Sequence, residues 1–154
     1  MRTLYLAAAT YAALGLASGL VYREVTKANG FTGDTQLAVM HTHLLALGFL
    51  VMLIVLALDA TLDISGTRSF TWFFITYNAG LVLTAVIMAW HGVLQVNGEH
   101  DVTAAIPGLA GLGHTLLTVG IVCLLVALRQ PVRDAIGRRA VARDVPRVEH
   151  HVEA

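Results

Sequence analysis

The chain has 154 residues, of which 56% are hydrophobic and 13% charged, and its ten basic and ten acidic side chains give a formal net charge of zero. A soluble domain of this length needs more polar side chains to cover its surface, and a chain without excess positive charge has no global field that attracts nucleic acid. The single cysteine, Cys123, excludes an intramolecular disulfide and a zinc site built from cysteines.

The apolar residues form four blocks, and each is near or above the roughly 20 residues that cross a hydrocarbon core of about 30 Å. None of the blocks has Asp, Glu, Lys or Arg in its middle. Because a helix satisfies its own backbone in lipid, we expect helices rather than open strands. The predicted fold class is all-α, a four-helix transmembrane bundle in one domain, residues 1–129, with helices at about 4–22, 37–58, 70–96 and 103–128.

The basic residues near the helix ends predict the orientation, since Lys and Arg collect on the cytoplasmic side of a membrane. Six arginines follow the fourth helix, whereas the segment between the third and fourth helices has Glu99 and Asp101 and no basic residue. We therefore expect a multi-pass protein with both chain ends in the cytoplasm. Because Gly137 and Pro146 disfavour a long helix, residues 130–154 are predicted to be a weakly ordered, basic cytoplasmic tail.

Small residues form a stripe on the first helix, where Gly15 and Gly19 are four residues apart. Such spacing is typical of close contact between helices in a membrane. Four short helices bury little lateral surface, so we expect this stripe to serve another copy in a homo-oligomer.

Four of the seven histidines lie inside the apolar blocks: His41 and His43 in the second, His91 in the third and His114 in the fourth. Ionisable side chains are costly in a membrane and usually face a partner or a cavity. If both chain ends are cytoplasmic, all four lie in the outer half of the bundle, within a turn or two of one level.

Imidazoles at one depth, with no carboxylate or cysteine beside them, suit a metal that takes nitrogen ligands, namely haem iron, copper or zinc. Haem is favoured because histidines on facing helices commonly hold it, and because small residues such as Gly111 lie on the face of His114. Arg23 and Lys27, at the outer end of the first helix, are candidates for contact with haem propionates or with lipid headgroups.

The spacing of His41 and His43 means that their rings point to opposite sides of one helix, since two residues turn a helix by about 200°. The two rings therefore do not ligate one metal from one face. We select His43 and His114 as the axial pair of haem b. His41 is the alternative to His43 as a haem ligand, and whichever of the two does not face the bundle core faces a second site or a subunit boundary; His91 is a further candidate metal ligand.

Several motifs, in order along the chain, resemble a family of small bacterial four-helix membrane proteins catalogued as a domain of unknown function. They are residues 21–24 (VYRE), 31–35 (FTGDT), 41–48 (HTHLLALG), 77–80 (YNAG), 95–98 (QVNG) and 111–114 (GLGH). The resemblance covers about residues 1–129 and implies the fold and a bacterial cell membrane, but almost no activity. In that family the position of His91 is often arginine, which leaves His41, His43 and His114 as the shared candidates.

The His-x-His pair also resembles the haem-binding helices of subunit one of haem–copper oxidases, in which one helix serves two metal centres from opposite faces. This shorter likeness implies two haems per chain, a haem shared between chains, or a haem with copper as a second metal.

Three functions remain open. The first is a membrane-bound b-type haem protein for electron transfer or for binding a diatomic gas. Two histidine ligands leave no free coordination position on the iron, which suits electron transfer, whereas a single histidine leaves one position free for a gas. The second is copper or zinc binding or transfer by the same histidines. The third is a structural or assembly membrane protein whose histidines are hydrogen-bonded core residues. No redox partner and no enzymatic activity is indicated.

Overall fold

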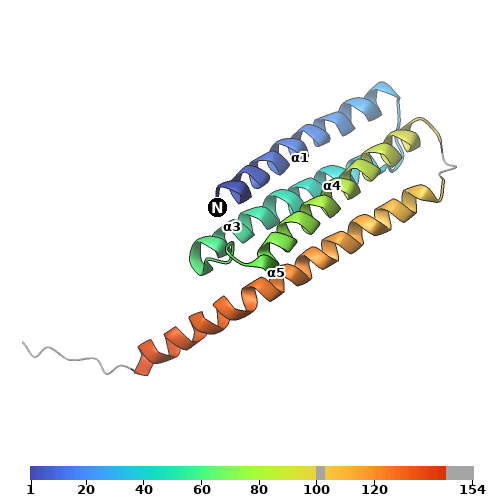
Figure 1. The fold of residues 1–154 in the computed structure, drawn as a ribbon. Helices are drawn as coiled ribbons and strands as arrows, with labels where there is room; N and C mark the ends of the chain where they lie inside the picture. The colour runs from blue at the N-terminus through green and yellow to red at the C-terminus, as the bar shows by residue number, and fades with distance from the viewer. Residues whose placement is uncertain (100–102, 145–154) are drawn as a thin grey trace, which may run out of the picture.

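The computed structural model describes residues 1–99 and 103–144, with side chains up to residue 141, and in this part of the chain it is helical with no strand. Figure 1 shows long helices running side by side, with α5 continuing beyond the others. The elements are α1 (Arg2–Ala28), α2 (Gln36–His43), the π-helix η1 (Leu44–Leu50), α3 (Val51–Leu62), α4 (Arg68–Val96) and α5 (Ala105–Asp144). The elements α2, η1 and α3 form one continuous helix, Gln36–Leu62, which we call span two.

Four helices of the described part are long and apolar enough to cross a membrane, namely α1, span two, α4 and α5. Large apolar side chains are exposed on their outer surfaces, among them Leu16 at 66% and Leu125 at 62%. Water would oppose such a surface, whereas lipid accepts it. The interior holds bulky side chains such as Phe73 and Tyr77, which are almost fully buried. The predicted four-helix membrane bundle is confirmed.

The helices pack in the order α1, span two, α4, α5. Helix α1 lies along all three parts of span two, span two contacts α4, and α5 packs along α4 while touching span two through α3. The small-residue stripe of α1 faces inward: a Cβ at Gly15 would lie 2.7 Å from the Leu45 side chain, and one at Gly19 would lie 3.9 Å from His41. The stripe therefore serves contact within the chain rather than the expected contact with another copy.

The end of the bundle where α1 and α4 finish, and where α2 and α5 begin, is called the histidine end. Here span two is bound to α4 by polar contacts. The Thr35 hydroxyl donates to the Gly92 carbonyl at 2.9 Å, and the Gln36 backbone N–H donates to Gln95 Oε1 at 2.8 Å. A Cβ at Gly92 would lie 2.5 Å from the Leu37 nitrogen, so only glycine permits this approach. These contacts set the position of α2 relative to α4.

The π-helical turns of η1 interrupt what the sequence predicts as one α-helix over 37–58. On one side Gly48 packs against the Tyr11 ring, where an added Cβ would lie 2.5 Å from Cγ. On the other, the Tyr77 hydroxyl donates to the Leu47 carbonyl at 3.0 Å. Widened turns are frequent near functional sites in helices, and this one directly follows His43.

Helix α5 differs from the sequence prediction at its far end. It continues to Asp144 through Pro131 and Gly137, where a weakly ordered tail was expected from residue 130. Alanine and arginine are strong helix formers, and Gln130 Nε2 donates to Asp134 Oδ1 at 2.9 Å across one turn. These local preferences outweigh one glycine and one proline. Residues 145–154, with Pro146, lie outside the described residues.

Candidate functional site

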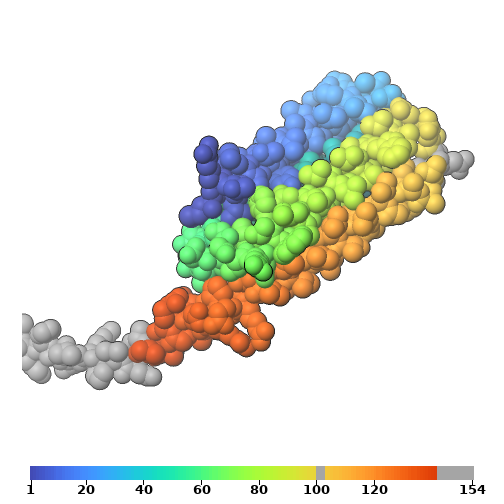
Figure 2. All heavy atoms as spheres, in the orientation of Figure 1, coloured from blue at the N-terminus to red at the C-terminus, as the bar shows by residue number. Residues whose placement is uncertain are grey.

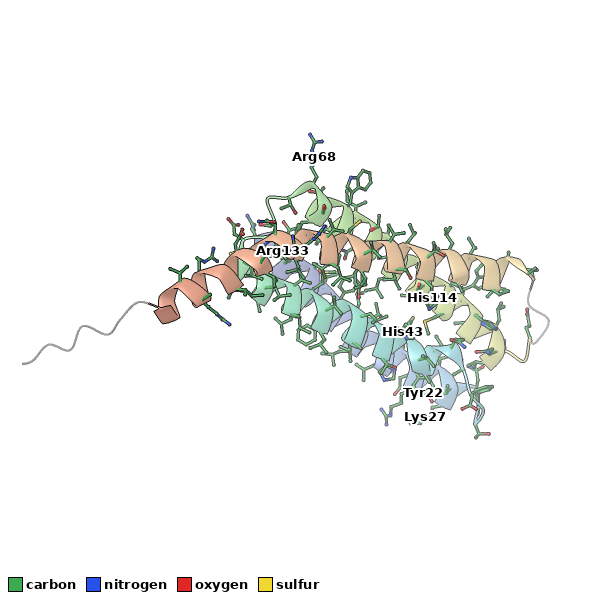
Figure 3. The ribbon with its side chains drawn as sticks, turned by 90° about the horizontal axis from the view of Figure 1, so that it is seen from below. Tyr22, Lys27, His43, Arg68, His114 and Arg133 are labelled. Atoms are coloured by element: carbon green, nitrogen blue, oxygen red, sulfur yellow. The ribbon has the colours of Figure 1, made fainter. Side chains whose placement is uncertain are left out.

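A groove runs between α2 and α5 at the histidine end, with α4 as its floor. Its volume is about 400 Å³, within the range of roughly 300–1,000 Å³ typical of small-molecule pockets. One histidine from each helix lines it: His43 from α2, His91 from α4 and His114 from α5. Figure 3 shows His43 and His114 on facing helices. We call this hollow the histidine groove.

The groove exists because α2 and α5 stand apart while both pack on α4. The position of α2 is set by the close approach of Leu37 to Gly92. The position of α5 is set by its close approach to Gly80, where an added Cβ would lie 2.8 Å from the Gly113 carbonyl and from the Leu117 nitrogen. The remaining wall is largely apolar, with Val39, Ile87, Met88 and Ile106 among its residues.

Two of the three imidazoles are oriented in the same way. His43 Nδ1 lies 3.1 Å from the Val39 carbonyl, and His114 Nδ1 lies 2.8 Å from the Ala110 carbonyl, in each case four residues earlier on the same helix. A carbonyl only accepts, so Nδ1 carries the proton in both rings, and in the neutral imidazole Nε2 then keeps its lone pair. This is the tautomer that binds a metal, with the other ring nitrogen bonded to a carbonyl as metal-binding histidines usually are.

The third imidazole, His91, is half-buried on the floor of the groove. Within residues 1–99 and 103–141, no group of three or more His, Cys, Asp or Glu side chains is close enough to hold a metal ion together. The three rings therefore border one hollow without converging on one point. A bare zinc ion needs three or four converging ligands, whereas haem iron takes one ligand from each side of a flat ring.

His41 lies on the opposite side of span two. Its ring stacks on Tyr22 of α1, with centroids 6.5 Å apart and planes 12° apart. Among the described residues, its buried Nδ1 has no hydrogen-bond partner. His41 is thus enclosed by α1 and does not border the histidine groove.

The other predicted site residues also lie outside the groove. Arg23 is exposed on α1 and pairs with Glu24 at 3.1 Å. Lys27 lies near the end of the same helix. In Figure 3 His43 lies between His114 and Lys27, so Lys27 is on the side of His43 away from α5. Gly111 is exposed, with nothing within 4 Å of an added Cβ, and Ala110 borders the groove in its place. The structure thus brings together His43, His91 and His114, and separates Arg23, Lys27 and Gly111 from them.

A family described as "Protein of unknown function (DUF2871)" matches residues 1–131 of the chain. The chain belongs to this family. No curated protein and no solved structure matches it significantly. Membership in DUF2871 agrees with the resemblance found in the motifs, whereas the likeness to haem–copper oxidases rests on the His-x-His pair alone.

A repeated spacing in the sequence, not used in the predictions above, marks the groove of this DUF2871 protein. Lining residues recur three, four or seven positions apart on each helix, which is one face of an α-helix. They are residues 36, 39 and 43 on α2, residues 84, 87, 88 and 91 on α4, and residues 106, 107, 110 and 114 on α5. Following the face of each histidine seven residues back along its helix, toward the N-terminus of the chain, would have found Gln36, Thr84 and Pro107.

Proposed function

We propose that this chain is a membrane-bound b-type haem protein, with haem b held in the histidine groove by His43 and His114. The observation that carries the proposal is the pair of imidazoles on facing helices, both bonded through Nδ1 to their own backbone and both free at Nε2. The apolar wall suits a flat, apolar ring, and the groove volume lies in the usual range for a small-molecule site.

Bound haem supplies a one-electron couple or a position for a diatomic ligand. Two histidine ligands leave no open position on the iron, so the pair favours electron transfer over gas binding. The chain itself contributes orientation and surroundings. The Val39 and Ala110 carbonyls fix the orientation of the two rings, while Ile87 and Ile106 limit water in the groove.

The test is an absorption spectrum of the detergent-purified protein, expressed with haem supplied, together with a pyridine haemochrome assay. We expect a Soret band that is lost in His43→Ala and in His114→Ala. A colourless wild-type protein contradicts the proposal. Copper or zinc found by elemental analysis without a Soret band would instead support a metal-ion function, and neither haem nor metal would support a structural one.

We also propose that the histidine end faces away from the cytoplasm in a bacterial cell membrane. The opposite end carries Arg68, Arg129 and Arg133, and basic residues favour the cytoplasmic side. Alkaline phosphatase and green fluorescent protein fused to the C-terminus give the measurement: fluorescence without phosphatase activity is expected, and the reverse pattern contradicts this orientation.

A further inference from the structure

Helix α5 leaves the bundle beyond the end of α3, as Figure 2 shows in orange and red, and carries arginines along the extension. A hollow of about 460 Å³ lies where this extension passes the last turn of α3. Its lining residues are Thr61 and Leu62 from α3, and Ala135, Arg138 and Arg139 from α5. We call it the basic groove; it lies at the opposite end of the molecule from the histidines.

The two arginines of the basic groove, Arg138 and Arg139, have no paired carboxylate within the part of the chain whose side chains are described. The acid nearest along the helix, Asp134, accepts a hydrogen bond from Gln130. Two adjacent guanidinium groups beside one hollow make a site for an anion, and guanidinium binds phosphate oxygens in a bidentate manner.

The surroundings of the groove favour an anion that carries acyl chains. Leu62 is four residues, or about 6 Å of helix, beyond Leu58, where the apolar block of span two ends. This places the groove near the level of lipid headgroups. Val132 and Ile136 on the same extension are 41% and 63% exposed, which water disfavours and a membrane interface accepts.

We propose that the basic groove binds the phosphate of an anionic phospholipid, with Arg138 and Arg139 on the phosphate and Leu62 against the glycerol and acyl region. The lipid thereby joins the α5 extension to the end of α3, across a hollow that protein side chains leave open. This site is independent of haem.

The test uses the full-length protein in mixed micelles of phosphatidylglycerol and phosphatidylcholine, with bound lipid counted by native mass spectrometry. We expect phosphatidylglycerol to be retained in preference to phosphatidylcholine, and R138Q/R139Q to reduce that retention roughly tenfold or more. The matched control, R129Q/R133Q, removes the same charge from the same helix outside the groove and should change retention little. Circular dichroism confirms that both variants remain helical.

Three results would overturn the proposal. Equal losses in both double variants would show that general basic charge, not the groove, attracts the lipid. Displacement of the lipid by inorganic phosphate or glycerol phosphate at millimolar concentration would show that the site takes a soluble anion. Absence of any preference for phosphatidylglycerol would also reject it.

Discussion

The two histidines of span two have opposite surroundings although they are two residues apart. His41 faces α1, where Tyr22 stacks on its ring and an added Cβ at Gly19 would be in ordinary contact with it. His43 faces a groove, because α5 packs on α4 and stands away from α2. The same side chain is therefore a packing residue on one side of the helix and an available ligand on the other. What decides its role is whether the neighbouring helix covers its face.

The prediction with the largest expected effect compares the haem content of His43→Ala with that of His41→Ala. We expect His43→Ala to abolish the Soret band, since it removes one of two iron ligands, and His114→Ala to do the same. His41→Ala should retain haem at close to wild-type content, because its ring does not border the groove. Haem-to-protein ratios from the haemochrome assay give the measurement. If His41→Ala lost its haem while His43→Ala kept a wild-type haem content, His41 rather than His43 would be the iron ligand.

The second prediction concerns a substitution that displaces α2, and with it His43, without replacing a histidine. Gly92→Ala places a Cβ 2.5 Å from the Leu37 nitrogen, so α2 must move away from α4. We expect the free energy of unfolding to fall by about 1–3 kcal/mol, with a lower haem content. Denaturation followed by circular dichroism checks this.

The control for that change is Gly108→Ala on α5, where nothing lies within 4 Å of an added Cβ. Its stability should equal or slightly exceed that of the wild type, since alanine is the better helix former. Equal destabilisation by both substitutions would contradict the role given to the contact between α2 and α4.

The third prediction concerns His91, which borders the groove from its floor. If His43 and His114 are the axial pair, His91→Leu keeps the six-coordinate spectrum and lowers haem affinity by roughly 10-fold, as loss of a supporting polar group does. Haem titration of the apoprotein measures the affinity. A change to a five-coordinate spectrum in His91→Leu would make His91 an axial ligand instead.

The smallest expected effect is that of Tyr77→Phe, which removes the hydrogen bond to the Leu47 carbonyl in η1. We expect a loss of about 1 kcal/mol in stability and unchanged haem content. Tyr5→Phe is the matched control, because Tyr5 is 61% exposed on α1. Indistinguishable unfolding of the two variants would show that this bond does not stabilise η1.

Much of the fold follows from the sequence, because length and apolar character define a membrane span one helix at a time. The depth of the histidines follows in the same way, from their distance to the ends of the blocks. Gln95, a polar residue inside the third apolar block, accepts the Gln36 N–H at the same level of the bundle. The helix spans depend on residues near one another in the chain, and the depth of the histidines and of Gln95 depends only on their distance from the helix ends.

The groove was not predictable, since it depends on contacts between residues far apart in sequence. Gly92 meets Leu37, Gly80 meets Leu117, and these approaches decide which faces of α2 and α5 stay uncovered. Small residues flank both His41 and His43, so composition did not distinguish them. Arg23 illustrates the same limit: its depth suited a propionate, but it projects from a helix on the other side of span two.

The π-helical turns of η1 have the effect of one additional residue inside span two. One residue is about 100° of rotation, so the faces before and after η1 are out of phase by that amount. If the same residues Leu44 to Leu50 were wound as a regular α-helix, the His41–His43 segment would turn by about 100° relative to α3. The orientation of His43 toward α5 is therefore set by the winding of the helix that follows it.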